Sequence, residues 1–200
     1  MKLLPTQYSK EIEVGTDEAG RGCLAGPITA AAVVFSENYS NQDLNDSKKL
    51  SRKKRNELRK VIEKDALAFS VVHVDNHEID KINILNASIL AMHKAIKSLK
   101  ITPKFILVDG NRFFKYENLE HKCVTSGDSK FQNIAAASIL AKTYRDELMI
   151  KLDKIHPQYD WKNNKGYPTK FHKNSIISNG LSIYHRKSFR LFDFQTKLKF

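Results

Sequence analysis

The chain has 200 residues, of which 41% are hydrophobic and 28% charged, and this length suits one domain with a substantial core. Its formal net charge of +12 is unusual for an enzyme of small molecules and favours a polyanionic partner. No apolar run reaches the roughly 18 residues of a membrane span, and residues 1–10 lack the apolar segment of a secretory signal. We therefore expect a cytoplasmic protein without a membrane partner.

The cationic residues cluster, whereas the two cysteines do not. Residues 161–200 contain nine Lys and Arg against one acid, and residues 48–55 read KKLSRKKR. A solvated surface would explain single lysines, but the clustering favours nucleic acid. Cys23 and Cys123 lack the CxxC spacing of a zinc or redox site, so we expect free thiols.

The first half of the chain predicts a hairpin, a helix, a strand and a helical region. Residues 12–14 alternate like a strand and lead into Asp17 and Glu18, which open a glycine-rich loop, and residues 28–35 predict the antiparallel partner strand. Ser51 caps a predicted helix to about residue 64, and residues 67–74 predict a third strand. From Asp75, apolar residues recur at helical spacing to residue 99.

The second half predicts buried strands and a long helix. Residues 105–108 are uniformly apolar, which is typical of a strand buried on both faces, and they lead into Asp109. A short strand over residues 122–125 precedes Asp128 and a helix over about residues 130–155. Thr169 caps a short helix to about residue 178. We predict an α/β catalytic domain over residues 1–158 and a small, helical, basic C-terminal appendage over residues 159–200.

Four carboxylates follow or end these elements: Asp17, Glu18, Asp109 and Asp128. Ligands of open α/β sheets gather at strand ends, and two Mg²⁺ or Mn²⁺ ions about 3.5–4 Å apart need acidic oxygens from several elements. A turn at Asp109 and a helix cap at Asp128 are the structural alternatives. The chain has no GxxxxGK[ST], HExxH or GxSxG motif, so these acids are its one candidate catalytic site.

Several short motifs occur in one order along residues 13–189. They are DEAGRG (17–22) with LAGP (24–27), DSKKL (46–50), VDG (108–110), GDSK (127–130), IAAASILAK (134–142) with RD (145–146), NKGY (164–167) and HRKSF (185–189). In this order they closely resemble the motifs of the type 2 ribonucleases H, the ribonuclease HII family.

The resemblance implies a ribonuclease H-like fold, with a five-stranded mixed sheet flanked by helices. It implies hydrolysis of RNA in RNA/DNA hybrids, dependent on Mg²⁺ or Mn²⁺ with two ions per site. It also implies incision 5′ of a single ribonucleotide in duplex DNA, which leaves 3′-hydroxyl and 5′-phosphate ends. The four acids match the family's catalytic, metal-binding set, with Asp17 as the bridging ligand.

Substrate-binding residues are also implied by the resemblance. Gly20, Arg21 and Gly22 match the loop that senses the ribose 2′-hydroxyl, which glycine backbone can approach closely. Tyr167 matches the tyrosine that packs on the sugar after the ribonucleotide. Candidate phosphate contacts are Lys48, Lys49, Ser138 and Lys142. Apart from the resemblance, their position among basic residues makes His172 and His185 further candidates, with a surface or structural role as the alternative.

Three residues depart from the family's pattern: Cys23 replaces a common proline, Asn133 a frequent serine and Pro168 a frequent glycine. Junction preference is therefore less firmly implied than metal dependence. The sequence predicts a monomeric endoribonuclease that removes ribonucleotides from DNA. The alternatives are a hybrid nuclease without junction preference and a non-catalytic nucleic-acid-binding module.

Overall fold

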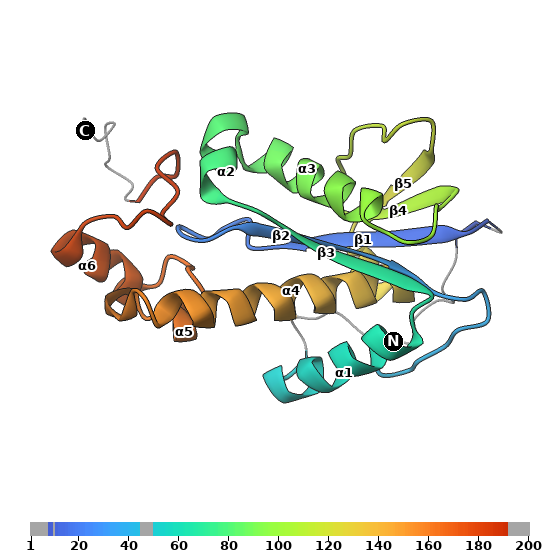
Figure 1. Cartoon of the computed structure of the whole chain (residues 1–200), viewed down its shortest axis with the longest axis horizontal. Coiled ribbons are helices and arrows are strands. Elements are labelled where there is room, and N and C mark those ends of the chain that lie inside the picture. Colours follow the sequence, from blue (N-terminus) through green and yellow to red (C-terminus); the bar gives the residue numbers. More distant parts are fainter. Residues whose placement is uncertain (1–7, 10, 45–49, 192–200) are drawn as a thin grey trace.

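A mixed β-sheet forms the centre of the molecule (Figure 1). The computed structural model describes residues 8–9, 11–44 and 50–191. The sheet has the strand order β3-β2-β1-β4-β5, in which β2 is antiparallel to β1 and β3, and β4 and β5 are parallel to β1. The strands are β1 (Glu13–Ala19), β2 (Ile28–Val34), β3 (Ala68–Val74), β4 (Phe105–Asp109) and β5 (Glu120–Val124). The predicted five-stranded mixed sheet is confirmed.

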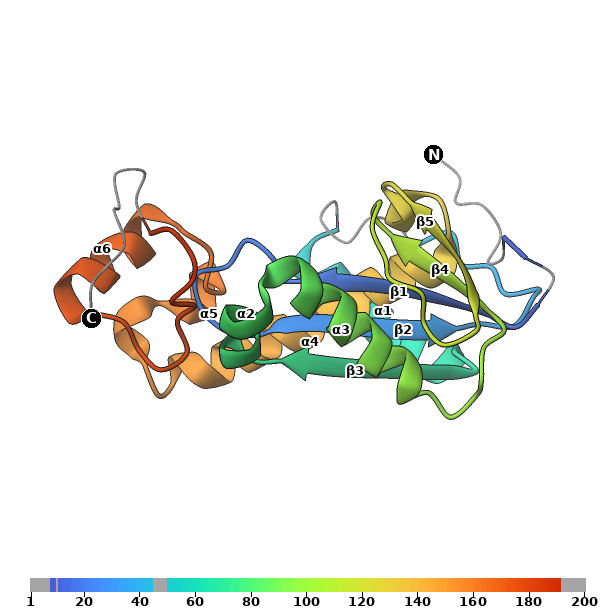
Figure 2. The same ribbon diagram turned by 90° about the horizontal axis from the view of Figure 1, so that it is seen from above.

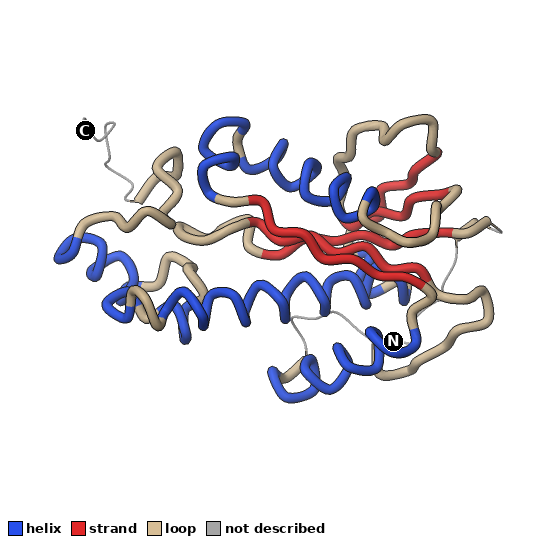
Figure 3. The backbone as a smooth tube through the Cα atoms, viewed as in Figure 1, coloured by secondary structure: helices blue, strands red, loops and turns tan. Residues whose placement is uncertain are grey.

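Helices cover both faces of the sheet. They are α1 (Arg52–Asp65), α2 (Asn76–Ile82), α3 (Ile84–Lys97), α4 (Gln132–Asp153), α5 (Trp161–Asn164) and α6 (Lys170–Asn179), with short 3₁₀ turns η1 (Gly127–Ser129) and η2 (Pro157–Tyr159). Helices α2 and α3 lie on one face and α1 and α4 on the other, while α5 and α6 extend past one end of the sheet (Figures 1 and 2). Figure 3 shows this as a layer of strands between two layers of helix. None of the helices in the described ranges is long and apolar enough to cross a membrane.

Polar caps start three of the helices where the sequence predicts them. The side chains of Ser51, Asp75 and Thr169 each accept a hydrogen bond from the backbone amide three residues later. Each cap satisfies an amide that has no partner inside its helix. The starts of α1, α2 and α6 are thereby fixed locally.

Small residues allow α4 to lie directly on the sheet. Strand β2 alternates between two cores: Ala30 and Ala32 pack with α3, and Ala31 and Val33 pack with α1 and α4. At the start of α4, a Cβ added to Gly15 of β1 would overlap the backbone of Asn133. This close approach brings the middle of α4 beside the end of β1, where the first two candidate acids lie.

Three predicted boundaries differ from the structure. The alternating pattern covers only residues 12–14, whereas β1 runs to Ala19; Asp17 and Glu18 lie near its end, as predicted. The helical region after Asp75 is broken at Asn83, which has φ of 69° and whose side chain accepts from the Leu85 and Asn86 amides at the start of α3. The long helix begins and ends about two residues inside its predicted limits.

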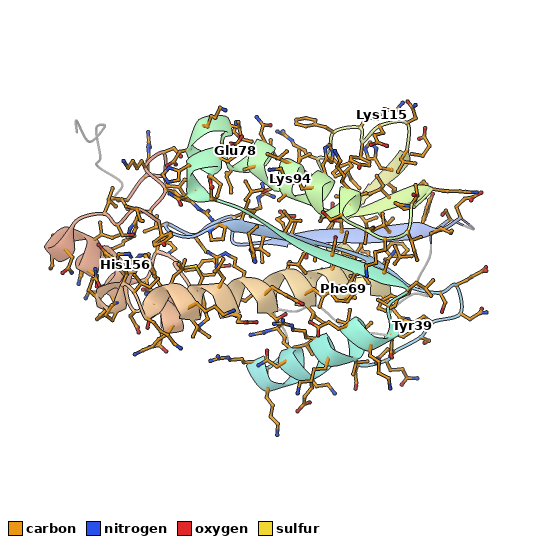
Figure 4. All side chains as sticks on the ribbon, in the orientation of Figure 1. Tyr39, Phe69, Glu78, Lys94, Lys115 and His156 are labelled. Atoms are coloured by element: carbon orange, nitrogen blue, oxygen red, sulfur yellow. The ribbon has the colours of Figure 1, made fainter. Side chains whose placement is uncertain are left out.

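The C-terminal elements share a core with the hairpin loop. Leu24 and Ala25 pack with Trp161, Ile176 and Leu191 in one buried cluster. Figure 4 labels His156 beside these elements, past the C-terminal end of α4. Apolar residues from both sides of residue 158 thus pack together, and the division of the chain at that residue stays a prediction.

Candidate active site

Asp17 and Glu18 occupy opposite faces of the end of β1, because successive strand residues point to opposite sides. Asp17 is buried, 6% exposed, and is hydrogen-bonded by Ser138 of α4. Glu18 lies on the side of α3, where it lines a cavity and accepts a 3.3 Å bond from Arg21. The strand pleat therefore divides the two carboxylates between two supporting helices.

Asp109 ends β4, the strand that runs parallel beside β1. Its Oδ1 accepts a 2.6 Å hydrogen bond from the Gly127 amide. Asp128 follows directly in η1 and is buried, 5% exposed. The parallel pairing places Asp109 near the end of β1, and the Gly127 bond ties the turn that carries Asp128 to Asp109.

Burial and mutual repulsion disfavour ionised carboxylates at this site. Burial raises the pKa of Asp17 well above its usual value, and the charges of Glu18 and Asp109 raise it further. Burial also raises the pKa of Glu18, which Asp109 raises further and Arg21 lowers. Such a set of crowded oxygen ligands suits a hard divalent cation, which would stabilise the ionised forms.

The acids do not form a closed metal cage. Among the residues that the structure describes, no three His, Cys, Asp or Glu side chains gather in an arrangement that could hold a metal ion. The negative charge of Asp109 nevertheless acts on both Asp17 and Glu18. The donor chemistry of the four acids, which is oxygen only, fits a hard divalent cation.

A cavity of about 290 Å³ opens beside Glu18 and Asp109. Its wall includes Arg21 and Arg112, together with Leu85, Ser88, Ile89 and Met92 of α3 and the backbone turn at Gly110 and Asn111. The sequence predicts Asp109 as a metal ligand, with a turn at Asp109-Gly110-Asn111 as the alternative, and does not single out Arg112. The signal available was its position three residues after a candidate acid.

Two buried arginines support the glycine-rich loop after β1 through hydrogen bonds. Arg145 and Arg186 are 0% and 1% exposed and donate to loop carbonyls. Burial lowers the pKa of Arg186 to about 10, so its guanidinium stays charged at neutral pH. Arg21, by contrast, projects outward with a side chain 54% exposed. Arg186 therefore supports the loop and is not part of the exposed basic surface to which its sequence cluster assigned it.

Tyr167 lies beside this loop, 39% exposed. Burial raises the pKa of its phenol, and the neighbouring Cys23 thiol raises it further. The Lys142 ammonium lies 5.7 Å from the centre of the Tyr167 ring and forms a 2.7 Å ion pair with Asp146. The structure thus brings Tyr167 and Lys142 together next to the loop.

The remaining predicted phosphate contacts have different outcomes. Ser138 lies one turn before Lys142 on α4 and interacts with Asp17. Lys48 and Lys49 lie outside the described residues. The prediction for His172 and His185 is wrong: they are 0% and 1% exposed and contact each other, with 3.2 Å between their Nε2 atoms. Both imidazoles belong to the core of the C-terminal elements.

The described part of the second basic cluster lies on α1. Arg52, Arg55 and Lys60 line a groove of about 490 Å³ between α1 and α4. Arg59, also in the groove, pairs with Glu63 and Glu147 at 2.7 and 3.0 Å. Acids therefore offset part of the positive charge on this face.

The fold and its buried acids define a ribonuclease H-like enzyme. The family model described as Ribonuclease HII matches residues 14–197. The ribonuclease HII of Parabacteroides distasonis is 56% identical over 99% of this chain and 100% of its own length, and that of Christiangramia forsetii is 56% identical over 96% and 98%. The crystal structure of ribonuclease H2 from Pyrococcus horikoshii aligns with a TM-score of 0.73 at 25% identity, covering 90% of this chain and 94% of its own.

The chain therefore belongs to the ribonuclease HII family. It is a metal-dependent endoribonuclease that acts on RNA/DNA hybrids. The resemblance read from its motifs and the fold class expected from it are both confirmed.

Proposed function

We propose that the protein incises duplex DNA on the 5′ side of a single embedded ribonucleotide and so begins ribonucleotide removal. The observation that carries this proposal is the backbone contact between the loop that follows β1 and the turn that carries Tyr167, next to the acids of β1. The Leu24 amide donates a 2.7 Å hydrogen bond to the Gly166 carbonyl, directly before Tyr167. Asp17 and Glu18 lie two to five residues before the loop glycines. Recognition of a ribose and cleavage beside it can then use adjacent groups.

The loop is suited to reading a 2′-hydroxyl. Gly20 has φ of +101°, a conformation that side chains disfavour, and Gly22 has open space where a Cβ would stand. Backbone groups at these positions can approach a sugar closely, and the 2′-hydroxyl is the group that distinguishes RNA from DNA. Tyr167 offers a partly exposed ring to the neighbouring sugar.

In this proposal the metal ions would be held by Asp17, Glu18, Asp109 and Asp128. Two Mg²⁺ or Mn²⁺ ions, when bound, supply positive charge to the attacking and leaving oxygens of an in-line displacement at phosphorus. The protein contributes carboxylates whose burial makes their charge costly without a cation. Ser138 orients Asp17, and the Gly127 amide orients Asp109. Lys142 supplies a cationic side chain for a phosphate near Tyr167.

Two labelled substrates test the proposal: a DNA duplex with one ribonucleotide and a long RNA/DNA hybrid. Each is incubated with Mn²⁺, with Mg²⁺ and with a chelator. We expect the wild type to cut both with either metal and neither with the chelator. Asp17→Asn should abolish cleavage of both, whereas Glu57→Gln, at an exposed acid of α1, should leave both rates unchanged.

Two other results would each indicate a different function for the protein. Cleavage of the hybrid alone would replace this proposal with a hybrid nuclease that lacks junction preference. Binding of both duplexes without cleavage by the wild type would indicate a nucleic-acid-binding module. The cytoplasmic location and the monomeric state expected from the sequence remain predictions beside this proposal.

A further inference from the structure

Two recognition segments far apart in the sequence lie against each other. The Leu24 amide donates a 2.7 Å hydrogen bond to the Gly166 carbonyl, and the Cys23 thiol lies 3.6 Å from the Lys165 carbonyl. A Cβ on Gly166 would stand 2.5 Å from the Ala25 carbonyl oxygen. The loop over residues 20–27 and the turn over residues 164–167 are therefore in direct backbone contact.

Arg145 of α4 joins these two segments. Its Nε donates to the Pro27 carbonyl at 2.9 Å and its Nη2 to the Ala25 carbonyl at 3.1 Å. Its Nη1 donates to the Lys165 carbonyl at 2.8 Å. One rigid, fully buried guanidinium thus fixes the end of the loop relative to the residue two positions before Tyr167.

The geometry of the guanidinium is essential to this link. Its donors are held in one plane, so the three carbonyls must keep a fixed spacing to be satisfied together. A lysine retains the charge, but its single nitrogen cannot occupy three donor positions. The loop is also fitted to this side chain, because a Cβ on Gly20 would overlap the Arg145 guanidinium.

We propose that Arg145 is a positioning residue for junction recognition: it fixes the spacing between the loop that reads the 2′-hydroxyl and the Tyr167 ring that reads the next sugar. This inference rests on the proposed function. The 2′-hydroxyl is common to long hybrids and single ribonucleotides, whereas a deoxyribose follows the ribonucleotide only at a junction. Loss of the spacing therefore impairs the junction substrate most.

Arg186 provides a matched comparison. It is equally buried and donates to the carbonyls of Gly26 and Arg21, both at 3.0 Å. These bonds support the loop and include none to the turn that carries Tyr167. A substitution of Arg186 should weaken recognition of the 2′-hydroxyl equally on both substrates. A substitution of Arg145 should in addition alter the distance between the loop and Tyr167.

The test compares kcat/KM on the single-ribonucleotide duplex and on the long hybrid for wild type, R145K, R186K and R59K. We expect R145K to lose at least tenfold more activity on the junction substrate than on the hybrid. R186K should reduce both to a similar extent. R59K, at an arginine between α1 and α4 that pairs with Glu63 and Glu147, should retain the wild-type ratio.

An R145K ratio equal to that of the wild type, with thermal unfolding showing a folded protein, would overturn the inference. Should R145K fail to fold, Gly166→Ala provides the second test, since the new Cβ pushes the turn from the loop in a chain that keeps the arginine at position 145. An unchanged ratio there would equally overturn it. Failure of the wild type to cut the junction substrate would instead refute the proposed function itself.

Discussion

Acid should destabilise the protein through the buried pair His172 and His185. The Trp161 indole donates to His172 Nε2 at 3.0 Å, and the His172 Nδ1 lies 2.9 Å from the Tyr167 carbonyl. The Ser182 amide donates to His185 Nδ1 at 2.9 Å. Because the indole and amide only donate and the carbonyl only accepts, these partners assign a neutral tautomer to each ring, with His185 donating to His172.

Protonation of either ring would place two donors face to face in a buried site. Burial, reinforced by the neighbouring His172, lowers the pKa of His185 to about 4. Burial lowers the pKa of His172 as well. An unfolded histidine titrates near about 6.5, so between these values the unfolded chain binds more protons than the folded chain. The free energy of unfolding therefore falls as the pH falls through this range.

For His185 alone, linkage gives a loss of about 2 kcal/mol by pH 5, and about 3 kcal/mol once the pH is below both pKa values. Urea unfolding monitored by tryptophan fluorescence, from pH 7.5 to pH 5, measures this loss. Since other groups also titrate, the quantity to compare is the difference in pH slope between wild type and His185→Gln. His77→Gln, at an exposed histidine of α2, should keep the wild-type slope. Parallel slopes for wild type and His185→Gln would refute this reasoning.

Three further changes should alter stability. Asp17→Asn removes a carboxylate whose burial raises its pKa, so the metal-free variant should melt higher than wild type in calorimetry and lose most of the shift that Mn²⁺ gives; a lower melting point would contradict this. Gly15→Ala forces a Cβ into the backbone of Asn133, so its urea midpoint should fall well below wild type, and an unchanged midpoint would refute the close packing of α4 on β1. Ser51→Ala removes the cap on the Lys54 amide and should lower the free energy of unfolding by about 1 kcal/mol. An unchanged free energy of unfolding would show that the cap does not stabilise α1.

Local patterns made much of the fold predictable. The caps at Ser51, Asp75 and Thr169 are contacts within one turn, so the residues that form them are visible in the sequence. Residues 106–108 are buried on both faces of β4, as a uniform apolar run indicates. The break at Asn83 was missed although its cap is also local: the Asn83 side chain accepts from the Leu85 and Asn86 amides, and its φ is 69°.

The buried arginines that support the site were less predictable from the sequence than its four acids. Asp17, Glu18, Asp109 and Asp128 carry a chemical pattern, but Arg145 and Arg186 read in the sequence as two more cations of a basic protein. Their contacts with the loop are to backbone carbonyls more than a hundred residues away along the chain. Composition cannot distinguish a buried guanidinium that supports a loop from an exposed one that meets phosphate.

The most direct test of the account is to map the products from a duplex that contains one ribonucleotide. The wild type with Mn²⁺ or Mg²⁺ should cut once, on the 5′ side of the ribonucleotide, and leave a 3′-hydroxyl that a DNA polymerase can extend. Cleavage on the 3′ side, a product that cannot be extended, or an intact duplex beside efficient cutting of a long hybrid would contradict it.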